Sequence, residues 1–368
     1  MSVFGVGFSF SKVWQDVRAG HNVSPAQNIS SFFHRFADSR LFETHGQEES
    51  IDEPSLMRKA FVGVTDFDWY TFLSSRPELT EVNFWQPGGR VLFRALSPGD
   101  LFLFKLHSPN NFIVGGGFFE TSSLLPLSLA WETFGAMNGV GSLQEMRKRV
   151  GKFRRQVVDA SDDFTIGNVI LQQTFFLHRY AWIPVPTDFS LNIVQGKTYD
   201  LDAGTGLQLR RELEARLADG ATISDQRIVA EGLVRRMYSD PVLARRRLGQ
   251  GAFRILVTDT YDRQCAITRE HTLPVLQAAH IKPVSEGGEH LVSNGLLLRS
   301  DVHTLFDRGY VTVTPDLRFR VSSRLDADWN NGKIYYDLDN KAIHIPQDIS
   351  CRPDLAALEW HAEKVFLR

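Results

Sequence analysis

The sequence predicts an α+β protein in three parts: a small β-barrel with helices over residues 1–202, a basic helical linker over 203–248, and a β-hairpin with a helix within 249–368. Three observations lead to this prediction. Short aromatic strands joined by tight turns fill residues 59–119, which is typical of a small barrel. Residues 207–248 have a helical pattern rich in arginine. Beyond Gly249 the composition changes, and a Gly-Gly turn precedes a capped helix.

Composition indicates a globular protein with enough apolar residues for a core in each part. Of the 368 residues, 43% are hydrophobic and 23% are charged, and the formal net charge is −2. Two cysteines exclude a disulfide framework and a four-cysteine zinc site. No apolar run reaches the roughly 20 residues that span a bilayer, and the N-terminus lacks the layout of a signal peptide. We therefore expect a cytoplasmic protein without a membrane partner.

The first part is expected to alternate strands and turns. The predicted elements are strands at 60–65, 101–106, 112–119, 167–171 and 173–177, and helices at 66–73 and 124–156. Residues 83–89, Asn83-Phe84-Trp85-Gln86-Pro87-Gly88-Gly89, are expected to form a turn-rich aromatic segment between strands.

The most informative segment lies within residues 278–309. It contains Ala278-Ala279-His280-Ile281-Lys282-Pro283, then Gly287-Gly288, then Asn294-Gly295-Leu296, and then Asp301-Val302-His303-Thr304-Leu305-Phe306-Asp307-Arg308-Gly309. The glycine pair can turn a hairpin, and a helix from Ser300 or Asp301 would end at Gly309. This segment resembles the HNH endonuclease family, in its restriction-enzyme branch, with His280, Asn294 and His303 as the name-giving residues. The resemblance implies a ββα-metal module that cuts DNA.

Phosphodiester hydrolysis requires a base for water and a cation for the charge that develops on phosphorus. His280 suits the base, because imidazole titrates near neutrality. His303 suits metal ligation, and Asn294 would either orient His280 or add its side-chain oxygen to the metal shell. The expected cofactor is one divalent ion, Mg²⁺, Mn²⁺, Co²⁺ or Ni²⁺.

The segment departs from the family pattern at Ala279, where many HNH nucleases have a metal-binding Asp or His. Either fewer protein groups hold the metal, or Asp301 or Asp307 contributes; Asp301 could equally be a helix cap. Cys265 stands without the paired cysteines of a zinc site, so we expect no structural zinc and a buried thiol.

Positive charge gathers just before this module. Residues 225–254 contain seven arginines (Arg227, Arg235, Arg236, Arg245, Arg246, Arg247 and Arg254) against three acids. Guanidinium groups suit phosphate oxygens and give affinity without sequence information. We expect Arg245, Arg246, Arg247, Arg254 and Lys282 to bind DNA, with a merely solvated helix face as the alternative.

The first part resembles the PUA-like superfamily, including its EVE and YTH branches and, less closely, SRA domains. The resemblance rests on Phe61-Val62-Gly63-Val64-Thr65-Asp66, Phe84-Trp85, Pro98-Gly99-Asp100-Leu101-Phe102 and Ile113-Val114-Gly115-Gly116-Gly117. It implies a domain that holds a flipped or modified base among aromatic rings. The candidate stacking residues are Trp69, Tyr70, Phe84 and Trp85, and the candidate edge readers are Asp66 and Asn83; each could instead belong to the core.

Together these patterns predict a modification-dependent restriction endonuclease acting on double-stranded DNA, with modified cytosine as the first candidate base. Cutting both strands with a single-metal site favours a homodimer. The alternatives are a nuclease that reads unmodified sequence, a nuclease activated by a small nucleotide signal, and a non-catalytic DNA-binding protein with a degenerate HNH fold.

Overall fold

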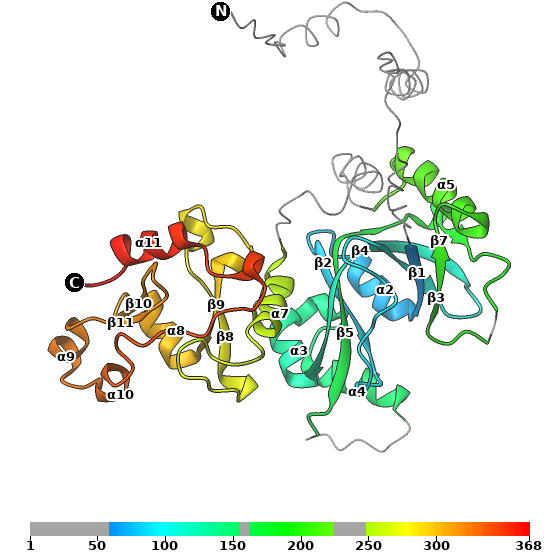
Figure 1. Ribbon diagram of the computed structural model, residues 1–368. Helices are drawn as coiled ribbons and strands as arrows, with labels where there is room; N and C mark the ends of the chain where they lie inside the picture. The colour runs from blue at the N-terminus through cyan, green and yellow to red at the C-terminus, as the bar shows by residue number, and fades with distance from the viewer. Residues whose placement is uncertain (1–58, 155–161, 191, 224–247) are drawn as a thin grey trace, which may run out of the picture. The chain divides into compact units, whose positions relative to one another are not determined.

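The computed structural model describes residues 59–154, 162–190, 192–223 and 248–368, and its fold is mixed α and β, as predicted (Figure 1). Arg245, Arg246 and Arg247 lie outside the described residues. Over the described ranges, no helix combines the length and apolar character needed to cross a membrane.

One sheet dominates the first part of the described chain. Its strands are β1 (Lys59–Thr65), β2 (Glu81–Gln86), β3 (Leu101–Leu106), β4 (Phe112–Pro126), β5 (Thr165–Phe176), β6 (Ile183–Pro184) and β7 (Gly196–Asp200). They follow the order β2-β5-β4-β3-β1-β7, with β6 paired to β4. β1 and β3 are parallel, and the other pairs are antiparallel. Because β2 and β7 remain as edges among the described strands, the sheet is open, and the predicted barrel does not close.

Strands β4, β5 and β2 differ from the predicted elements, and β4 runs on to Pro126 instead of ending at residue 119. β5 runs unbroken through Gln173, where two strands were predicted, and Gln173 takes a φ of 49° within it. β2 includes Asn83, Phe84 and Trp85, so the first half of the segment predicted to be turn-rich is a strand. The aromatic residues of β2 lie in a strand because β2 pairs with β5. Since β5 is far away in the sequence, the local pattern around residues 83–89 could not indicate this pairing.

The alternation of β3 explains why helices cover both faces of the sheet. Leu101 and Leu103 belong to one apolar cluster, whereas Phe102 and Phe104 belong to another. The helices of this part are α2 (Phe67–Ser74), α3 (Leu127–Phe134), η2 (Gly135–Asn138), α4 (Leu143–Phe153), η3 (Arg179–Ala181) and α5 (Gly204–Ala218). The single helix predicted over 124–156 is therefore the end of β4 followed by α3, η2 and α4.

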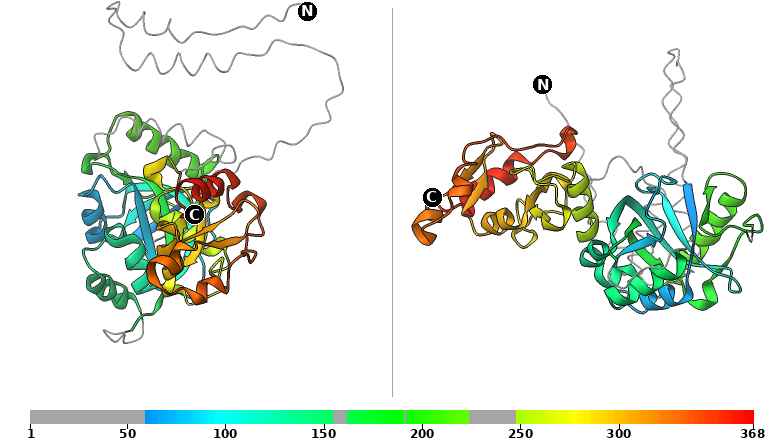
Figure 2. Two further views of the ribbon diagram at one scale, coloured as in Figure 1. Left: turned by 90° about the vertical axis from the view of Figure 1, so that its left-hand side faces the viewer. Right: turned by 90° about the horizontal axis from the view of Figure 1, so that it is seen from below.

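Helix α5 occupies the described part of the predicted linker. Its leucines Leu209, Leu213 and Leu217 recur every four residues, and all three are buried in the sheet's core. The helix lies beside β7, as the views in Figures 1 and 2 show. This described stretch thus packs with the sheet, while the domain boundaries at 202 and 248 stay a prediction.

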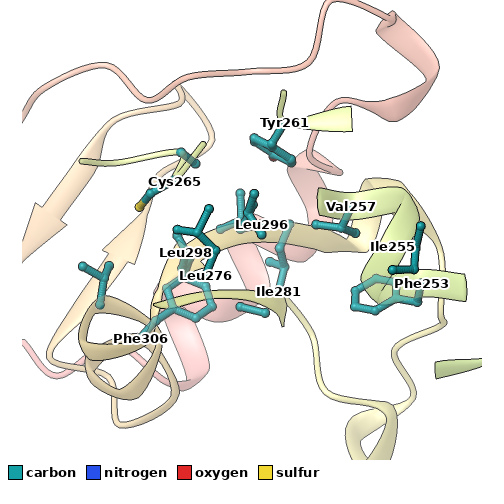
Figure 3. Packing of buried hydrophobic residues seen from close by; sticks show 14 of the residues in the cluster. Phe253, Ile255, Val257, Tyr261, Cys265, Leu276, Ile281, Leu296, Leu298 and Phe306 are labelled. Atoms are coloured by element: carbon teal, nitrogen blue, oxygen red, sulfur yellow. The ribbon is translucent and has the colours of Figure 1, made fainter. Parts of the chain in front are cut away.

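The second part contains the predicted hairpin and helix. Its elements are α7 (Gln250–Thr260), η4 (Leu273–Val275), β8 (Leu276–His280), η5 (Val284–Glu286), η6 (Val292–Asn294), β9 (Gly295–Arg299), α8 (Ser300–Asp307), β10 (Val311–Val313), β11 (Phe319–Val321), α9 (Arg324–Trp329), α10 (Lys333–Tyr336), η7 (Ile349–Cys351) and α11 (Leu355–Lys364). β8 and β9 pair antiparallel, and Gly309, with a φ of 76°, follows α8 as its expected end signal. Figure 3 shows the apolar side chains of β8 and β9 between those of α7 and Phe306 of α8.

Helix α7 connects the two parts. One apolar cluster includes Phe134 and Ile166 of the sheet part as well as Phe253 of α7. Polar contacts reinforce it: Arg254 pairs with Glu132 at 2.9 Å, and Arg263 donates to Ser123 of β4 at 3.0 Å. The part that contains the β8–β9 hairpin therefore packs directly on the sheet part through α7.

Candidate active site

The hairpin places His280 at the end of β8, opposite Gly295. A Cβ added at Gly295 would lie 2.5 Å from Val257 and 3.1 Å from Phe253, both on α7. Glycine is thus required at this position because α7 packs closely against the hairpin. The same close packing sets the His280 ring against Phe253, with centroids 4.1 Å apart and planes 8° apart.

His280 is half-buried, and its ring is held from two sides. Phe253 stacks on one face, and Nε2 lies 3.0 Å from Nδ1 of His290. Burial, followed by the nearby His290 and His303, lowers the pKa of His280 to about 4. The imidazole is therefore neutral at physiological pH, with a lone pair for a proton, although its pKa lies below the near-neutral value expected from the sequence because the ring is partly buried.

Asn294 is buried and fixes the loop that follows His280. Its Oδ1 accepts from the backbone N–H of Lys282 at 3.0 Å. Its Nδ2 donates to the carbonyls of Lys282 and Glu289, both at 2.9 Å. Because the backbone engages both ends of the amide, this geometry favours the role of orienting His280 over that of ligating a metal.

His303 and Asp307 lie one turn apart on α8, with Nε2 of His303 3.3 Å from Oδ2 of Asp307. On the other side, Nδ1 of His303 is 2.8 Å from Oε1 of Gln277, which can only accept. Nδ1 therefore carries the proton, and the Nε2 lone pair faces Asp307. An imidazole oriented in this way by an outer partner, beside a carboxylate, suits a divalent ion.

The ionisation of this pair supports the same interpretation. Burial lowers the pKa of His303, which Asp307 opposes, and burial raises the pKa of Asp307, which His303 opposes. A cation would relieve the burial cost of the carboxylate. Across the described residues, no group of three or more His, Cys, Asp and Glu side chains gathers for a metal. The two ligands would leave the remaining positions to water and phosphate oxygens.

Asp301, the other acidic candidate, is already hydrogen-bonded to neighbouring side chains. Its carboxylate accepts from Arg299 at 2.6 and 2.7 Å and from the Tyr335 hydroxyl at 2.9 Å. The Arg299 hydrogen bonds, with that of Tyr335, lower its pKa to about 2. Asp307 is therefore the better placed of the two acids that the sequence offered.

Two predicted DNA-binding cations fall within the described residues. Nζ of Lys282 lies 5.5 Å from the ring centre of Trp360. Arg254 pairs with Glu132, and its charge contributes to the lowered pKa of His303, after burial and the opposing effect of Asp307. Arg254 is thus near the candidate metal ligands.

A second candidate site is a cavity of about 1080 Å³ in the sheet part. Of the six predicted base-recognition residues, Asp66, Trp69, Phe84 and Trp85 line it, whereas Tyr70 and Asn83 do not. Its other lining groups include Phe153, Arg90, Arg94, His107, Gln86 and Arg154. The size matches or exceeds the roughly 300–1,000 Å³ of small-molecule sites.

Burial separates the four lining candidates. Trp69 and Phe84 are 3% and 8% exposed and pack on each other and on Phe104, so they form the floor of the cavity. Trp85 is only partly buried and contacts the half-exposed Phe153. Asp66 is a third exposed and lies 3.6 Å from His107. Trp85 and Asp66 are thus the accessible ones among the candidates for stacking and edge reading.

The remaining two candidates have structural contacts. Tyr70 is buried, and its hydroxyl donates to the carbonyl of Leu177 at 3.3 Å. Asn83 is fully buried and donates to Oδ1 of Asn138 at 2.9 Å and of Asn168 at 2.7 Å. Asn138 also accepts the indole N–H of Trp85 through its carbonyl at 3.0 Å, so this asparagine network holds the cavity wall.

Sequence reasoning missed two residues around His280: His290 and Phe253. His290 had a usable signal, because it lies between Gly288 and Asn294 in the hairpin loop that must return past His280. Phe253 had none, since it reaches His280 only through the packing of α7.

Comparison with known proteins gives a family for one part of the chain. Residues 265–314 match the HNH endonuclease family. No curated protein matches the chain. Among solved structures, it is similar to an ASCH protein from Zymomonas mobilis, at 11% identity and a TM-score of 0.29, over 41% of this chain and 94% of that chain. A mutant of that protein is 12% identical with a TM-score of 0.30, and the match covers 42% of this chain and 99% of that chain. The modification-dependent TagI restriction endonuclease is 12% identical with a TM-score of 0.25, and the match covers 82% of this chain and 81% of that chain.

Proposed function

Because the chain carries an HNH endonuclease domain, we propose that it is a divalent-metal-dependent restriction endonuclease that cuts DNA containing a modified base. In this proposal the HNH module hydrolyses the phosphodiester bond. The cavity of the sheet part receives the flipped base.

One observation carries the nuclease part: a neutral, restrained His280 shares its module with the oriented pair His303 and Asp307. His280 would take a proton from the attacking water as its oxygen bonds to phosphorus. A divalent ion held by His303 and Asp307 would supply charge stabilisation for the phosphate and the leaving oxygen. Asn294 would keep His280 in place by fixing Lys282.

The reader part of the proposal rests on the cavity. Stacking between a base and Trp85 would offset the cost of extrusion, which is on the order of a few kcal/mol. Asp66 is an acceptor, so it favours bases with an exocyclic amino group, cytosine, adenine and guanine, over thymine. Arg90 and Arg94, both exposed on the cavity lining, could contact the flanking phosphates.

The same arginines favour one second candidate, a nuclease activated by a small nucleotide that fills the cavity. Calorimetry with free nucleotides distinguishes the two. A base reader should bind modified duplex far more tightly than any mononucleotide, whereas an activated nuclease should cut unmodified DNA once the nucleotide is added.

Plasmid cleavage tests the nuclease itself. We expect wild-type protein with Mg²⁺ or Mn²⁺ to nick or linearise plasmid that carries modified bases, and excess chelator to stop it. His280→Ala should remove cleavage while keeping the wild-type melting temperature and DNA affinity. A folded His280→Ala variant with near-normal cleavage would refute the role of His280, and full activity in chelator would refute the metal.

A further inference from the structure

We propose that His290 is a positioning residue for His280: its Nδ1 accepts the Nε2 proton of His280 and so turns the Nδ1 lone pair of His280 toward the attacking water. This inference rests on the proposed nuclease function. It assigns a role to a residue of the hairpin loop that binds neither metal nor DNA in the account above.

The contact itself requires one donor and one acceptor. Nε2 of His280 and Nδ1 of His290 are 3.0 Å apart, and the ring centroids are 4.9 Å apart with planes at 70°. In two neutral imidazoles, one of these nitrogens carries a proton and the other a lone pair. The direction of the hydrogen bond therefore sets the tautomer of both rings.

Only one direction leaves His280 able to act as a base. If His290 donated, Nε2 of His280 would be the acceptor and its proton would stay on Nδ1, so neither nitrogen could take a proton from water. If His280 donates, its Nδ1 has a free lone pair. That Nδ1 makes no hydrogen bond with any described residue, so it is available to the reaction.

The surroundings hold both rings in this relation. Phe253 stacks on His280 and meets His290 edge-on, with centroids 5.8 Å apart and planes at 64°. The carbonyl of His290 accepts from the backbone N–H of Leu248 at 3.1 Å. The carbonyl of the preceding Glu289 accepts from Asn294 at 2.9 Å. These contacts hold the backbone of the His290 loop and the faces of both rings, so the two imidazoles stay within hydrogen-bond distance.

In the cleavage step, this tautomer lets His280 take the proton that the attacking water loses. The water oxygen bonds to phosphorus as one water proton moves to Nδ1 of His280. The bond from phosphorus to the leaving oxygen breaks, and that oxygen keeps the electron pair and takes a proton from solvent. His280 is then an imidazolium whose Nε2–H donates a charge-assisted hydrogen bond to His290, which stabilises the cation as it forms.

Variants at position 290 test the acceptor directly. His290→Asn places an amide oxygen near the position of Nδ1, whereas His290→Gln places it near that of Nε2. We expect His290→Asn to retain kcat within about tenfold, and His290→Gln and His290→Leu to lower it by on the order of 10² to 10⁴, as loss of a correctly held base does. KM should change little if His290 acts only through His280, so a large rise in KM would assign His290 to DNA binding instead. His271→Ala, at an exposed histidine of the same module, should match wild type.

A spectroscopic readout separates failure of this inference from failure of the nuclease function. In the full chain labelled with ¹⁵N-histidine, we expect His280, assigned by comparison with His280→Gln, to have a protonated Nε2 and an unprotonated Nδ1 at pH 7. His290→Leu should change that tautomer ratio, and His290→Asn should restore it; a folded His290→Leu is verified by its melt.

Three further results would overturn the inference. A proton on Nδ1 of wild-type His280 is the first. Equal activity of the Asn, Gln and Leu variants is the second. Broadening of both imidazole signals on adding Mn²⁺, with equal affinity at the two rings, is the third, because it would place a cation between them. If the protein cuts no DNA while the tautomer is as expected, the proposed function fails and the positioning contact stands.

Discussion

The carboxylate of Glu81, on the edge strand β2, accepts the backbone N–H of Ala252 at 2.7 Å in the first turn of α7, and that of Gly251 at 2.9 Å. Glu81 is only 5% exposed, and burial raises its pKa against the effect of these hydrogen bonds. A Cβ at Gly249 would lie 2.6 Å from this carboxylate, so the glycine admits it. Since β2 also carries Trp85 and α7 carries Phe253, Glu81 joins the cavity wall to the support of His280.

Replacing Glu81 should therefore weaken the junction. We expect Glu81→Ala to lower the free energy of unfolding by about 1–3 kcal/mol, because two buried amides lose their acceptor. Glu81→Gln should cost less, since its oxygen can still accept one bond. Chemical denaturation measures the effect, with Glu78→Ala at an exposed site as the control. Equal stability of Glu81→Ala and Glu78→Ala would show that the contact contributes nothing.

Asp307 should matter for metal rather than for fold. We expect Asp307→Asn to raise the Mn²⁺ concentration for half-maximal cleavage by at least about tenfold, because a neutral amide replaces the ligand carboxylate. Asp316→Asn, at an exposed acid, should leave the metal dependence unchanged. A metal titration of cleavage gives both values. An unchanged midpoint in Asp307→Asn would assign the metal to other groups.

Trp85 should govern discrimination between modified and unmodified DNA. Stacking a base on an aromatic ring is worth roughly 1–3 kcal/mol, so Trp85→Ala should weaken binding of modified duplex on the order of tenfold to a hundredfold. Trp329→Ala, at an exposed tryptophan of the nuclease part, serves as the matched control. Binding isotherms and melts are compared for both. A much lower melting temperature for Trp85→Ala would make Trp85 a core residue, and full preference for modified DNA in a stable variant would place the reader elsewhere.

The acid stability of the protein should depend on His361. Burial lowers the pKa of His361 to about 4, although a hydrogen bond to the Phe306 carbonyl opposes this. Between pH 6.5 and 4 the unfolded chain binds the proton that the folded chain excludes, so stability falls as pH falls, by about 1.4 kcal/mol per unit for one such group. His361→Gln should flatten this slope in urea midpoints measured from pH 7 to 5. An identical slope would show that His361 titrates normally.

The hairpin and helix of the nuclease could be predicted because their signals are local. The Gly287-Gly288 pair, the apolar residues before His280 and the end signal at Gly309 act over a few residues, and β8, β9 and α8 form where they indicate. The open edge between β2 and β7 could not be predicted, because strand closure depends on pairing across the whole sheet.

The burial and the contacts of the candidate-site residues could not be predicted from the sequence either. Trp69 lies in a segment predicted to be helical and Trp85 in one predicted to be turn-rich, but neither pattern indicates that the first is 3% exposed while the second is accessible beside Phe153. Glu81 has the appearance of an ordinary strand acid, and only the packing of α7 makes it a buried acceptor. Sequence patterns report periodicity and turn chemistry, whereas these roles arise from contacts between distant elements.

Cleavage of matched duplexes, identical except for modification at cytosine or adenine, tests the central claim most directly. We predict metal-dependent cleavage of a duplex with modified cytosine or adenine, little cleavage of the unmodified one, and none by His280→Ala. Equal cutting of modified and unmodified duplexes by wild-type protein would contradict the claim that the sheet part reads a modified base.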